Sequence, residues 1–275
     1  MSKVVIITGC STGIGRDLAI NLIETGYSVV ATARKLDSLT DIPAALKLTL
    51  DVTQPESVKS AVSQVIERFG HLDVLVNNAG YAQVGAIEDI SDDQVKRMYD
   101  VNVFGVMRMI RAVIPQMRKQ GAGQIINISS IAGKMATPVN GTYSSTKFAM
   151  EAMSDAMRLE LEPFNIQVIL VEPGAIKTNF DQTVHTHGDE ILSNPASPYL
   201  PLYRHYQQVS DSMRKQEAGP EVVSKVIRKV METPKPKARY LAGVSFPTQA
   251  VMFMRDLIWD FAVRQLFKIS TLGSE

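Results

Sequence analysis

Short, nearly unbroken runs of Val, Ile and Leu alternate with longer segments of helical periodicity from residue 3 to about residue 175. Runs that are apolar at every position are typical of strands buried on both faces of a parallel sheet. Because these runs alternate with helix-like segments, the pattern predicts repeated βαβ units and an α/β fold with one doubly wound parallel sheet. The expected strands are KVVIIT, SVVATA, LKLTLDV, LDVLVN, QIINIS and QVILVEP, followed by a last strand at ARYLAG.

The pattern changes after Thr178. Residues 179–218 contain HTHGDE and the proline-bearing SNPASPYLPLYRHY but no clear strand, which predicts an irregular substrate-loop region, either a lid or binding loop or a disordered segment. GPEVVSKVIRKVMETP then predicts a helix with Pro220 near its first position. Nothing in the composition divides the chain, so we expect a single domain over residues 1–275.

Residues 246–275 are expected to form a C-terminal helical extension. In FPTQAVMFMRDLIWDFAVRQLFKI, charged residues recur every four positions and the other face is broadly apolar. We favour a helix packed on its own domain or on a partner subunit. The alternatives are a wall over an apolar substrate pocket and peripheral contact with a membrane surface.

Composition narrows the class of protein. The 275 residues are 45% hydrophobic and 21% charged, which suits a globular protein with a sizeable core. The net charge of +1 gives no electrostatic footprint for nucleic acid. Cys10 is the only cysteine, so an intrachain disulfide and a zinc–cysteine cluster are excluded, and this thiol is expected to fill space.

The setting of the protein is inferred from the same numbers. The chain opens directly on a strand-like run and lacks the apolar stretch of a signal peptide. No run reaches the roughly 18 apolar residues that a membrane span needs. We therefore expect a cytoplasmic protein. His185 and His187 alternate in HTHGDE, but histidines in a loop are more often solvated than metal-bound, so no metal site is expected.

The segment TGCSTGIG lies between the first strand and the first helix. Gly9, Gly13 and Gly15 would let the backbone approach a bulky anion, and the helix beyond them offers free N–H groups to a pyrophosphate. This arrangement predicts a dinucleotide site, although its spacing differs from the G-x-G-x-x-G fingerprint. The alternative is a tight strand-to-helix turn that needs glycine for packing only.

The end of the second strand bears on the choice of nucleotide. An acidic residue there would bind the ribose hydroxyls of NAD, whereas an arginine accommodates the additional phosphate of NADP. The sequence VVATARK has Ala33 at that place and then Arg34 and Lys35. Arg34 favours NADP(H), and NAD(H) is the alternative cofactor. The alternative interpretation of Arg34 and Lys35 is that both are solvated charges on a loop.

Three further motifs accompany the glycine turn: NNAG after the fourth strand, YDVNVFG around Asn102, and SSIAG ahead of YSSTK. Together they resemble the short-chain dehydrogenase/reductase family over roughly residues 3–180. The resemblance implies a single Rossmann-type domain with about seven parallel strands, in agreement with the strand pattern. It also implies a homo-oligomer, a dimer or a tetramer.

The resemblance assigns site residues one by one. The family's catalytic residues correspond to Asn102, Ser130, Tyr143 and Lys147. Asp51 matches an acid that contacts adenine, NNAG the adenine-ribose side, and EPGAIKT the nicotinamide side. The full set of cofactor-binding residues is Gly9, Ser11, Thr12, Gly13, Ile14, Gly15, Arg34, Asp51, Val52, Asn78, Ala79, Gly80, Tyr143, Lys147, Pro173, Gly174, Ile176 and Thr178.

The residue types suit proton transfer beside a hydride donor. A tyrosine has an ordinary pKa of about 10, and a cation within about 4–6 Å lowers that pKa. Lys147 follows Tyr143 by one helical turn, so both can lie on one face. Ser130 would stabilise charge on a substrate oxygen. By resemblance, Asn102 helps to hold a water that links the lysine to solvent.

The sequence thus predicts an NADP(H)-dependent oxidoreductase that interconverts an alcohol and a ketone or aldehyde, with Tyr143 as general acid and base. The extended C-terminal part and the TGCSTGIG and SSIAG motifs are similar to the hydroxysteroid and retinol dehydrogenase branch. An apolar carbonyl compound is the expected small-molecule substrate. The alternative is a dinucleotide-binding sensor or scaffold that has kept the fold without turnover.

Overall fold

The computed structural model describes residues 2–178, 189–214, 217–253 and 265. One parallel sheet of seven strands, ordered β3-β2-β1-β4-β5-β6-β7, forms its centre. All seven strands expected from the apolar runs are present, and the α/β prediction is confirmed. Their bounds are β1 (Val4–Ile7), β2 (Ser28–Ala33), β3 (Leu46–Thr49), β4 (Val74–Asn77), β5 (Gly123–Ile128), β6 (Ile166–Pro173) and β7 (Arg239–Ala242).

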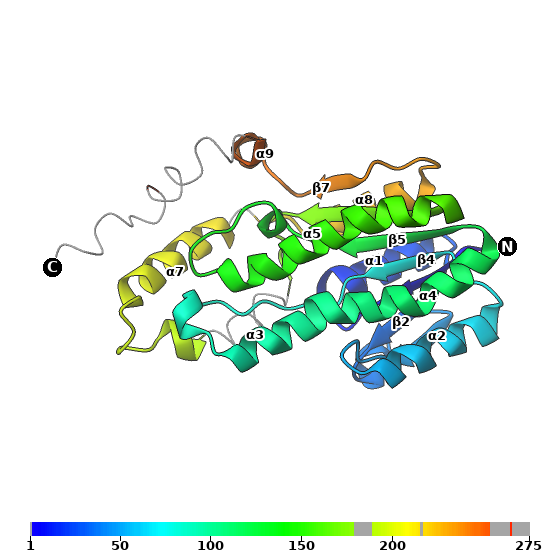
Figure 1. Ribbon diagram of the computed structural model, residues 1–275, viewed down its shortest axis with the longest axis horizontal. Helices are drawn as coiled ribbons and strands as arrows, with labels where there is room; N and C mark the ends of the chain where they lie inside the picture. The colour runs from blue at the N-terminus through cyan, green and yellow to red at the C-terminus, as the bar shows by residue number, and fades with distance from the viewer. Residues whose placement is uncertain (1, 179–188, 215–216, 254–264, 266–275) are drawn as a thin grey trace.

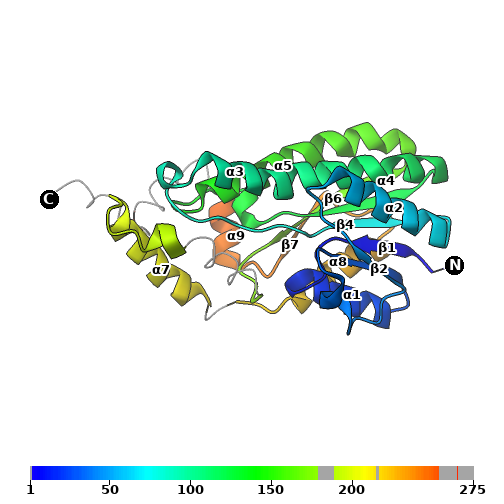
Figure 2. The ribbon, with the colours of Figure 1, turned by 90° about the horizontal axis from the view of Figure 1, so that it is seen from below.

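Helices cover both faces of the sheet, which explains why the strands are apolar at every position. In β1, Val4 and Ile6 belong to one core cluster, while Val5 and Ile7 belong to a second. The first cluster packs under α2 (Pro55–Phe69), α4 (Val106–Gln120) and α5 (Gly141–Leu161), and the second packs on α1 (Gly13–Glu24) and α8 (Glu221–Glu232). Figure 2 shows these two layers on opposite sides of the strands.

The strand order reverses next to β1, which pairs with β2 on one side and with β4 on the other. In open α/β sheets, ligands bind beyond the carboxyl ends of the strands at such a reversal. The loops that follow the strands lie at the end of the sheet remote from the N-terminus, and α7 (Leu200–Arg214) lies at that end as well (Figure 1).

The region expected to be irregular contains a helix. Residues 200–214 form α7, and Leu202 and Tyr203 from this helix are buried with Val84 and Val139 in a small separate core cluster. The apolar face of α7 packs on the loop after β4, so tertiary contacts decide a conformation that the proline-rich sequence obscured. Residues 179–188, with His185 and His187, lie outside the described residues.

The segment after β7 leads into a helix, α9 (Phe246–Phe253). Apart from residue 265, the tail from residue 254 onwards lies outside the described residues, and so does most of the predicted amphipathic stripe. The helix expected around residues 219–234 is confirmed as α8, with Pro220 at its N-cap and Val223, Ile227 and Val230 buried. Within the described part of the chain, no helix has the length and apolar character to cross a membrane.

Candidate active site

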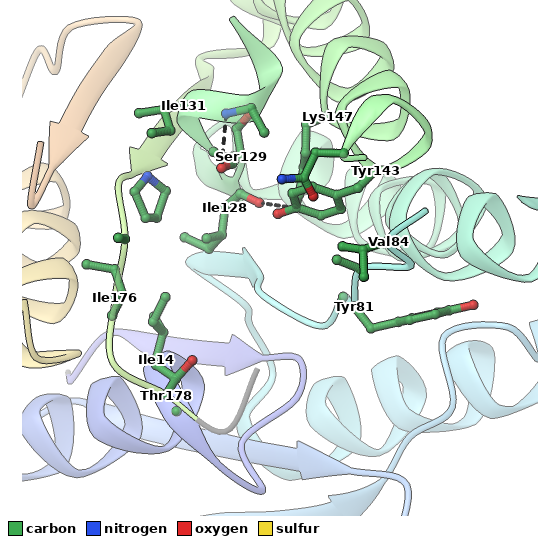
Figure 3. Close-up of a pocket in the computed structure, with 18 of the residues that line it drawn as sticks. Ile14, Tyr81, Val84, Ile128, Ser129, Ile131, Tyr143, Lys147, Ile176 and Thr178 are labelled. Atoms are coloured by element: carbon green, nitrogen blue, oxygen red, sulfur yellow. Dashed lines mark hydrogen bonds between the residues drawn. The ribbon is translucent and has the colours of Figure 1, made fainter. Parts of the chain in front are cut away.

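A cavity of about 1500 Å³ lies beyond the carboxyl ends of the central strands. Figure 3 shows Tyr143 and Lys147 entering it from α5, with Ile14 and Thr178 toward its other end. Two predicted residues, Asn102 and Gly15, do not line the cavity; the predicted residues that line it are Gly9, Ser11, Thr12, Gly13, Ile14, Arg34, Asp51, Val52, Asn78, Ala79, Gly80, Ser130, Tyr143, Lys147, Pro173, Gly174, Ile176 and Thr178.

The glycine turn forms a cradle that side chains would fill. Gly9 and Gly13 have φ angles of +75° and +59°, which other residues rarely adopt. A Cβ atom at Gly13 would lie 3.1 Å from Cβ of Thr178, and one at Gly15 would collide with Nδ2 of Asn78 and the Gly9 carbonyl. The first turn of α1 receives no side-chain cap from Thr12, so its N–H groups are available to an anion.

A hydrogen-bond network fixes the shape of this turn. Nδ2 of Asn78 donates to the carbonyls of Thr8 (2.9 Å) and Gly9 (3.1 Å). Oγ1 of Thr8 accepts from the N–H groups of Asn78 and Ala79, both at 2.9 Å. The amide of Asn78 therefore holds the turn. Thr8 opens the same motif but was not among the site residues predicted from it.

Cys10 lies beneath the turn and is fully buried. Burial raises the pKa of its thiol to about 12, so the thiolate is strongly disfavoured. The expectation that Cys10 fills space agrees with this environment.

The far end of the cavity is lined by groups after β2 and β3. Arg34 is exposed and lines the cavity next to Ala33. Oδ1 of Asp51 accepts from the N–H (2.9 Å) and the hydroxyl (2.7 Å) of Thr53. These bonds fix the loop after β3, and the Arg34 guanidinium lines the cavity near this loop.

Ser130 and Tyr143 meet at the opposite end of the cavity. The N–H of Ala132 donates to Oγ of Ser130 (3.1 Å), which fixes the serine at the start of a short 3-10 turn, η4 (Ile131–Gly133). Burial raises the pKa of the Tyr143 phenol, and its hydrogen bond with Ser130 opposes that rise. Ser130 therefore contacts the phenol directly, and the two hydroxyls form one polar patch.

Lys147 lies on the same face of α5. Its Nζ is 5.7 Å from the centre of the Tyr143 ring and donates to the carbonyl of Ile128 at 2.9 Å. The side chain is buried, and burial lowers the pKa of Lys147 to about 8, against the opposing charge of Glu151. The amine is thus fixed beside the phenol with a pKa closer to neutrality.

Asn102 supports this arrangement from behind the cavity wall. It is fully buried in a π-helical turn, Asp100–Gly105, between α3 (Asp92–Tyr99) and α4. Its Nδ2 donates to the Tyr81 carbonyl (2.8 Å) and to Oγ1 of Thr146 (3.1 Å), and its Oδ1 accepts from the Tyr81 N–H (3.1 Å). Asn102 therefore ties α5 to the loop after β4.

Comparison with known proteins agrees with this geometry. A model of the short chain dehydrogenase family matches residues 3–188. The chain belongs to this family. Its members are oxidoreductases with a nucleotide-binding fold, and the resemblance noted in the sequence is confirmed.

Individual relatives align with most of the length of this short-chain dehydrogenase. A 3-ketodihydrosphingosine reductase of Bacteroides thetaiotaomicron is 37% identical over 257 residues, which span 94% of this chain and 93% of that protein. Human 17-beta-hydroxysteroid dehydrogenase type 1 is 35% identical over 260 residues, which span 88% of this chain and 78% of that protein.

Solved structures share the fold. A short-chain dehydrogenase from Streptomyces avermitilis aligns with a TM-score of 0.79 and 30% identity, over 100% of this chain and 99% of that one. A 3-ketoacyl-(acyl-carrier-protein) reductase from Brucella melitensis complexed with NADH has a TM-score of 0.72 and 25% identity, over 87% of this chain and 95% of that one. ElxO with NADP bound has a TM-score of 0.72 and 27% identity, over 88% of this chain and 96% of that one.

The wall opposite Tyr143 in this short-chain dehydrogenase is the part that sequence analysis missed. It is assembled from the loop after β4, the loop after η4, the segment before α7, α7 itself and the segment before α9. Its apolar members are Val84, Met135, Leu192, Val209 and Val244, joined by the aromatic rings of Tyr81 and Tyr206. The available signal was the apolar spacing within α7, which the neighbouring prolines masked. Within the described residues, no group of three or more His, Cys, Asp or Glu side chains could hold a metal.

Proposed function

We propose that the protein is an NADP(H)-dependent oxidoreductase that interconverts an apolar secondary alcohol and its ketone, or a primary alcohol and its aldehyde. One observation carries the proposal. The Ser130–Tyr143 patch and the glycine cradle line a single cavity of about 1500 Å³, so a hydride donor anchored in the cradle can extend to the phenol.

The cofactor site combines the cradle with the loops on either side of it. The uncapped start of α1 and the turn at Gly9 and Gly13 suit a pyrophosphate. Arg34 would face the ribose phosphate of NADP, and Pro173, Gly174, Ile176 and Thr178 would border the nicotinamide. Solved relatives carrying NADH and NADP support a nicotinamide dinucleotide in general, and Arg34 is the reason to prefer NADP(H). When bound, the nicotinamide supplies the hydride.

The chain's own residues manage the proton. In ketone reduction, Ser130 donates a hydrogen bond to the substrate oxygen while Tyr143 delivers the phenolic proton to it. Lys147, fixed at the Ile128 carbonyl, places a cation beside the phenol and favours the phenolate that remains. Asn102 contributes indirectly: its hydrogen bonds to Tyr81 and Thr146 hold the loop after β4 against α5. Alcohol oxidation reverses these roles, with Tyr143 as the base.

An apolar substrate agrees with the wall of the cavity. Val84, Met135, Leu192 and Val209 offer apolar contact and Tyr206 adds an aromatic surface. Charged side chains, among them Asp211 and Arg214 at the end of α7, also line the cavity. Two relatives carry names that refer to a ketosphingoid and to a hydroxysteroid. Both names point to bulky, largely hydrocarbon molecules, so we propose a carbonyl group on such a scaffold as the substrate class.

A substrate panel tests this proposal. NADPH absorbance would be followed with steroid ketones, long-chain ketones, retinoid aldehydes and small polar ketones at equal concentration. We expect turnover with apolar ketones or aldehydes and at least a tenfold lower kcat/KM with the polar ones. Tight NADPH binding without turnover on any carbonyl would instead favour a dinucleotide sensor. We further propose one domain that assembles as a dimer or tetramer, which light scattering of the purified protein would test.

A further inference from the structure

Two buried carboxyl groups lie side by side behind the catalytic segment. Glu151 from α5 and Glu172 near the end of β6 have side chains only 7% and 4% exposed. Burial is the largest cause that raises the pKa of Glu172, and Glu151 raises this pKa further through its charge and a hydrogen bond. Two like charges this close and this buried are costly unless they share a proton or meet cations.

Two cations enclose the pair. Nζ of Lys134 lies 2.9 Å from Oε2 of Glu151 and 3.8 Å from Oε1 of Glu172. Nε of Arg239, on β7, lies 3.1 Å from Oε2 of Glu151 and 3.4 Å from Oε1 of Glu172. Each carboxyl group therefore faces the same lysine and the same arginine.

The four residues connect the segments that carry the proposed chemistry. Lys134 follows Ser130 by four residues, just after η4. Glu151 follows Lys147 by one turn of α5, and Glu172 immediately precedes Pro173 and Gly174. The serine, the tyrosine–lysine helix and the segment proposed to border the nicotinamide thus share one buried anchor.

The hydrogen bonding of the pair leaves room for one proton. Among the described residues, Oε1 of Glu151 and Oε1 of Glu172 find no protein hydrogen-bond donor. Burial and the neighbouring Glu151 charge raise the pKa of the Glu172 carboxyl to about 7. A proton on Glu172 can be donated to Glu151, which would satisfy one of these oxygens and remove the repulsion.

We propose that Glu151 and Glu172 are positioning residues that hold one shared proton. Through Lys134 and Arg239, the pair keeps Ser130, Tyr143 and the Pro173–Gly174 segment in fixed positions relative to one another. This inference rests on the proposed function. When the shared proton leaves as pH rises, the hydrogen bond between the two carboxyl groups is lost and two negative charges face each other. The anchor then keeps only its ion pairs to Lys134 and Arg239, and the three segments are held less firmly. The charged or titratable groups that face the pair or its partners are Lys134, Lys147, Asp155, Arg158 and Arg239.

The test compares three amide variants in ketone reduction over pH 5.5 to 9. Glu172→Gln keeps a donor toward Glu151 but cannot lose a proton. Glu151→Gln also removes the repulsion. In addition, it removes the negative charge that raises the pKa of Lys147, so this pKa should fall further. Asp155→Asn is the matched control, because Asp155 contacts the same Arg239 at 2.5 Å but is 46% exposed.

We expect the parent kcat to fall in two steps, near pH 7 and near pH 8. Glu172→Gln should lose the first step and keep at least a third of the parent kcat at pH 6. Glu151→Gln should lose the first step and move the second to lower pH, while Asp155→Asn keeps both. The Kd for NADPH, measured by fluorescence, should change less than twofold in Glu172→Gln.

A second measurement does not depend on turnover. In parent protein labelled with ¹³C at the glutamate side-chain carboxyl carbon, one resonance should titrate near pH 7 and vanish in Glu172→Gln. An unchanged two-step profile in Glu172→Gln, or no glutamate resonance titrating above pH 6, would overturn this inference alone. Absence of turnover in the parent on every carbonyl would overturn the proposed function instead, while the resonance would still report on the pair.

Discussion

Nζ of Lys147 lies over the face of the Tyr143 ring, 5.7 Å from its centre, and is fixed there by the Ile128 carbonyl. Within the chain itself, burial raises the pKa of the phenol more than the Ser130 hydrogen bond lowers it. Fixed positive charge beside the ring therefore has to offset the remaining cost of ionisation. The buried lysine is the group of this site that carries such a charge.

Arg34→Asp should reverse the cofactor preference. The substitution removes the cation expected at the ribose phosphate and puts a like charge in its place. A hydrogen bond to a charged group contributes about 1.5–3 kcal/mol, so the ratio of kcat/KM for NADPH over NADH should fall by about 10- to 100-fold. Lys35→Asp is the control, since Lys35 does not line the cavity. If Lys35→Asp alters the ratio as much as Arg34→Asp, general charge rather than a specific contact sets the preference.

Tyr203→Phe should loosen the substrate wall. The fully buried Tyr203 donates its hydroxyl hydrogen to Asp89 and accepts from the Ala86 N–H at 2.9 Å, which anchors α7 to the loop after β4. Loss of these bonds should lower the free energy of unfolding by about 1–3 kcal/mol and raise KM for apolar ketones. Denaturant unfolding and steady-state kinetics measure the two effects.

The control for that variant is Tyr199→Phe, which removes a solvent-exposed bond to Glu88 of 2.6 Å. This change should cost less than about 0.5 kcal/mol, because exposed partners re-form bonds with water. Equal effects of the two substitutions on KM would argue against α7 as a wall anchored by Tyr203. The Kd for NADPH should stay the same in both variants, since the cradle lies on α1.

Stability should depend on pH through Glu172. Its pKa is about 7 in the folded protein against 4.5 for the ordinary side chain, so the folded state binds this proton more tightly. The contribution is fully present below about pH 4.5 and is lost as pH rises through 7. The Tm of the parent should therefore fall relative to the Tm of Glu172→Gln from pH 5 to pH 7.5, and the difference should then level off. A constant difference across this range would show that Glu172 titrates as it does in water.

The sequence predicted the sheet well because each strand contacts two cores. Alternate residues of β1 enter different clusters, so an unbroken apolar run identifies a strand with helices on both faces. The residues around the glycine cradle were predictable for a related reason. The position of a motif between a strand and a helix is fixed by these two elements, which the sequence pattern predicts.

Other parts of the site depend on contacts between distant segments. The apolar spacing of α7 is masked by neighbouring prolines, and neither the π-helical turn at Asn102 nor the pairing of Glu151 with Glu172 carries a local signal. Glu151 and Glu172 are 21 positions apart in the sequence and meet only because α5 packs on β6. The local pattern therefore predicts the strands and the glycine turn, the family resemblance proposes the catalytic residues, and tertiary packing decides what surrounds and positions them.

Tyr143→Phe tests the central claim most directly. The variant keeps the ring, the cavity and the cradle but removes the phenolic proton. We predict that ketone reduction falls by at least about 100-fold, in line with the usual contribution of a general acid, while the Kd for NADPH changes less than twofold. Turnover within threefold of the parent, with NADPH binding intact, would contradict the account.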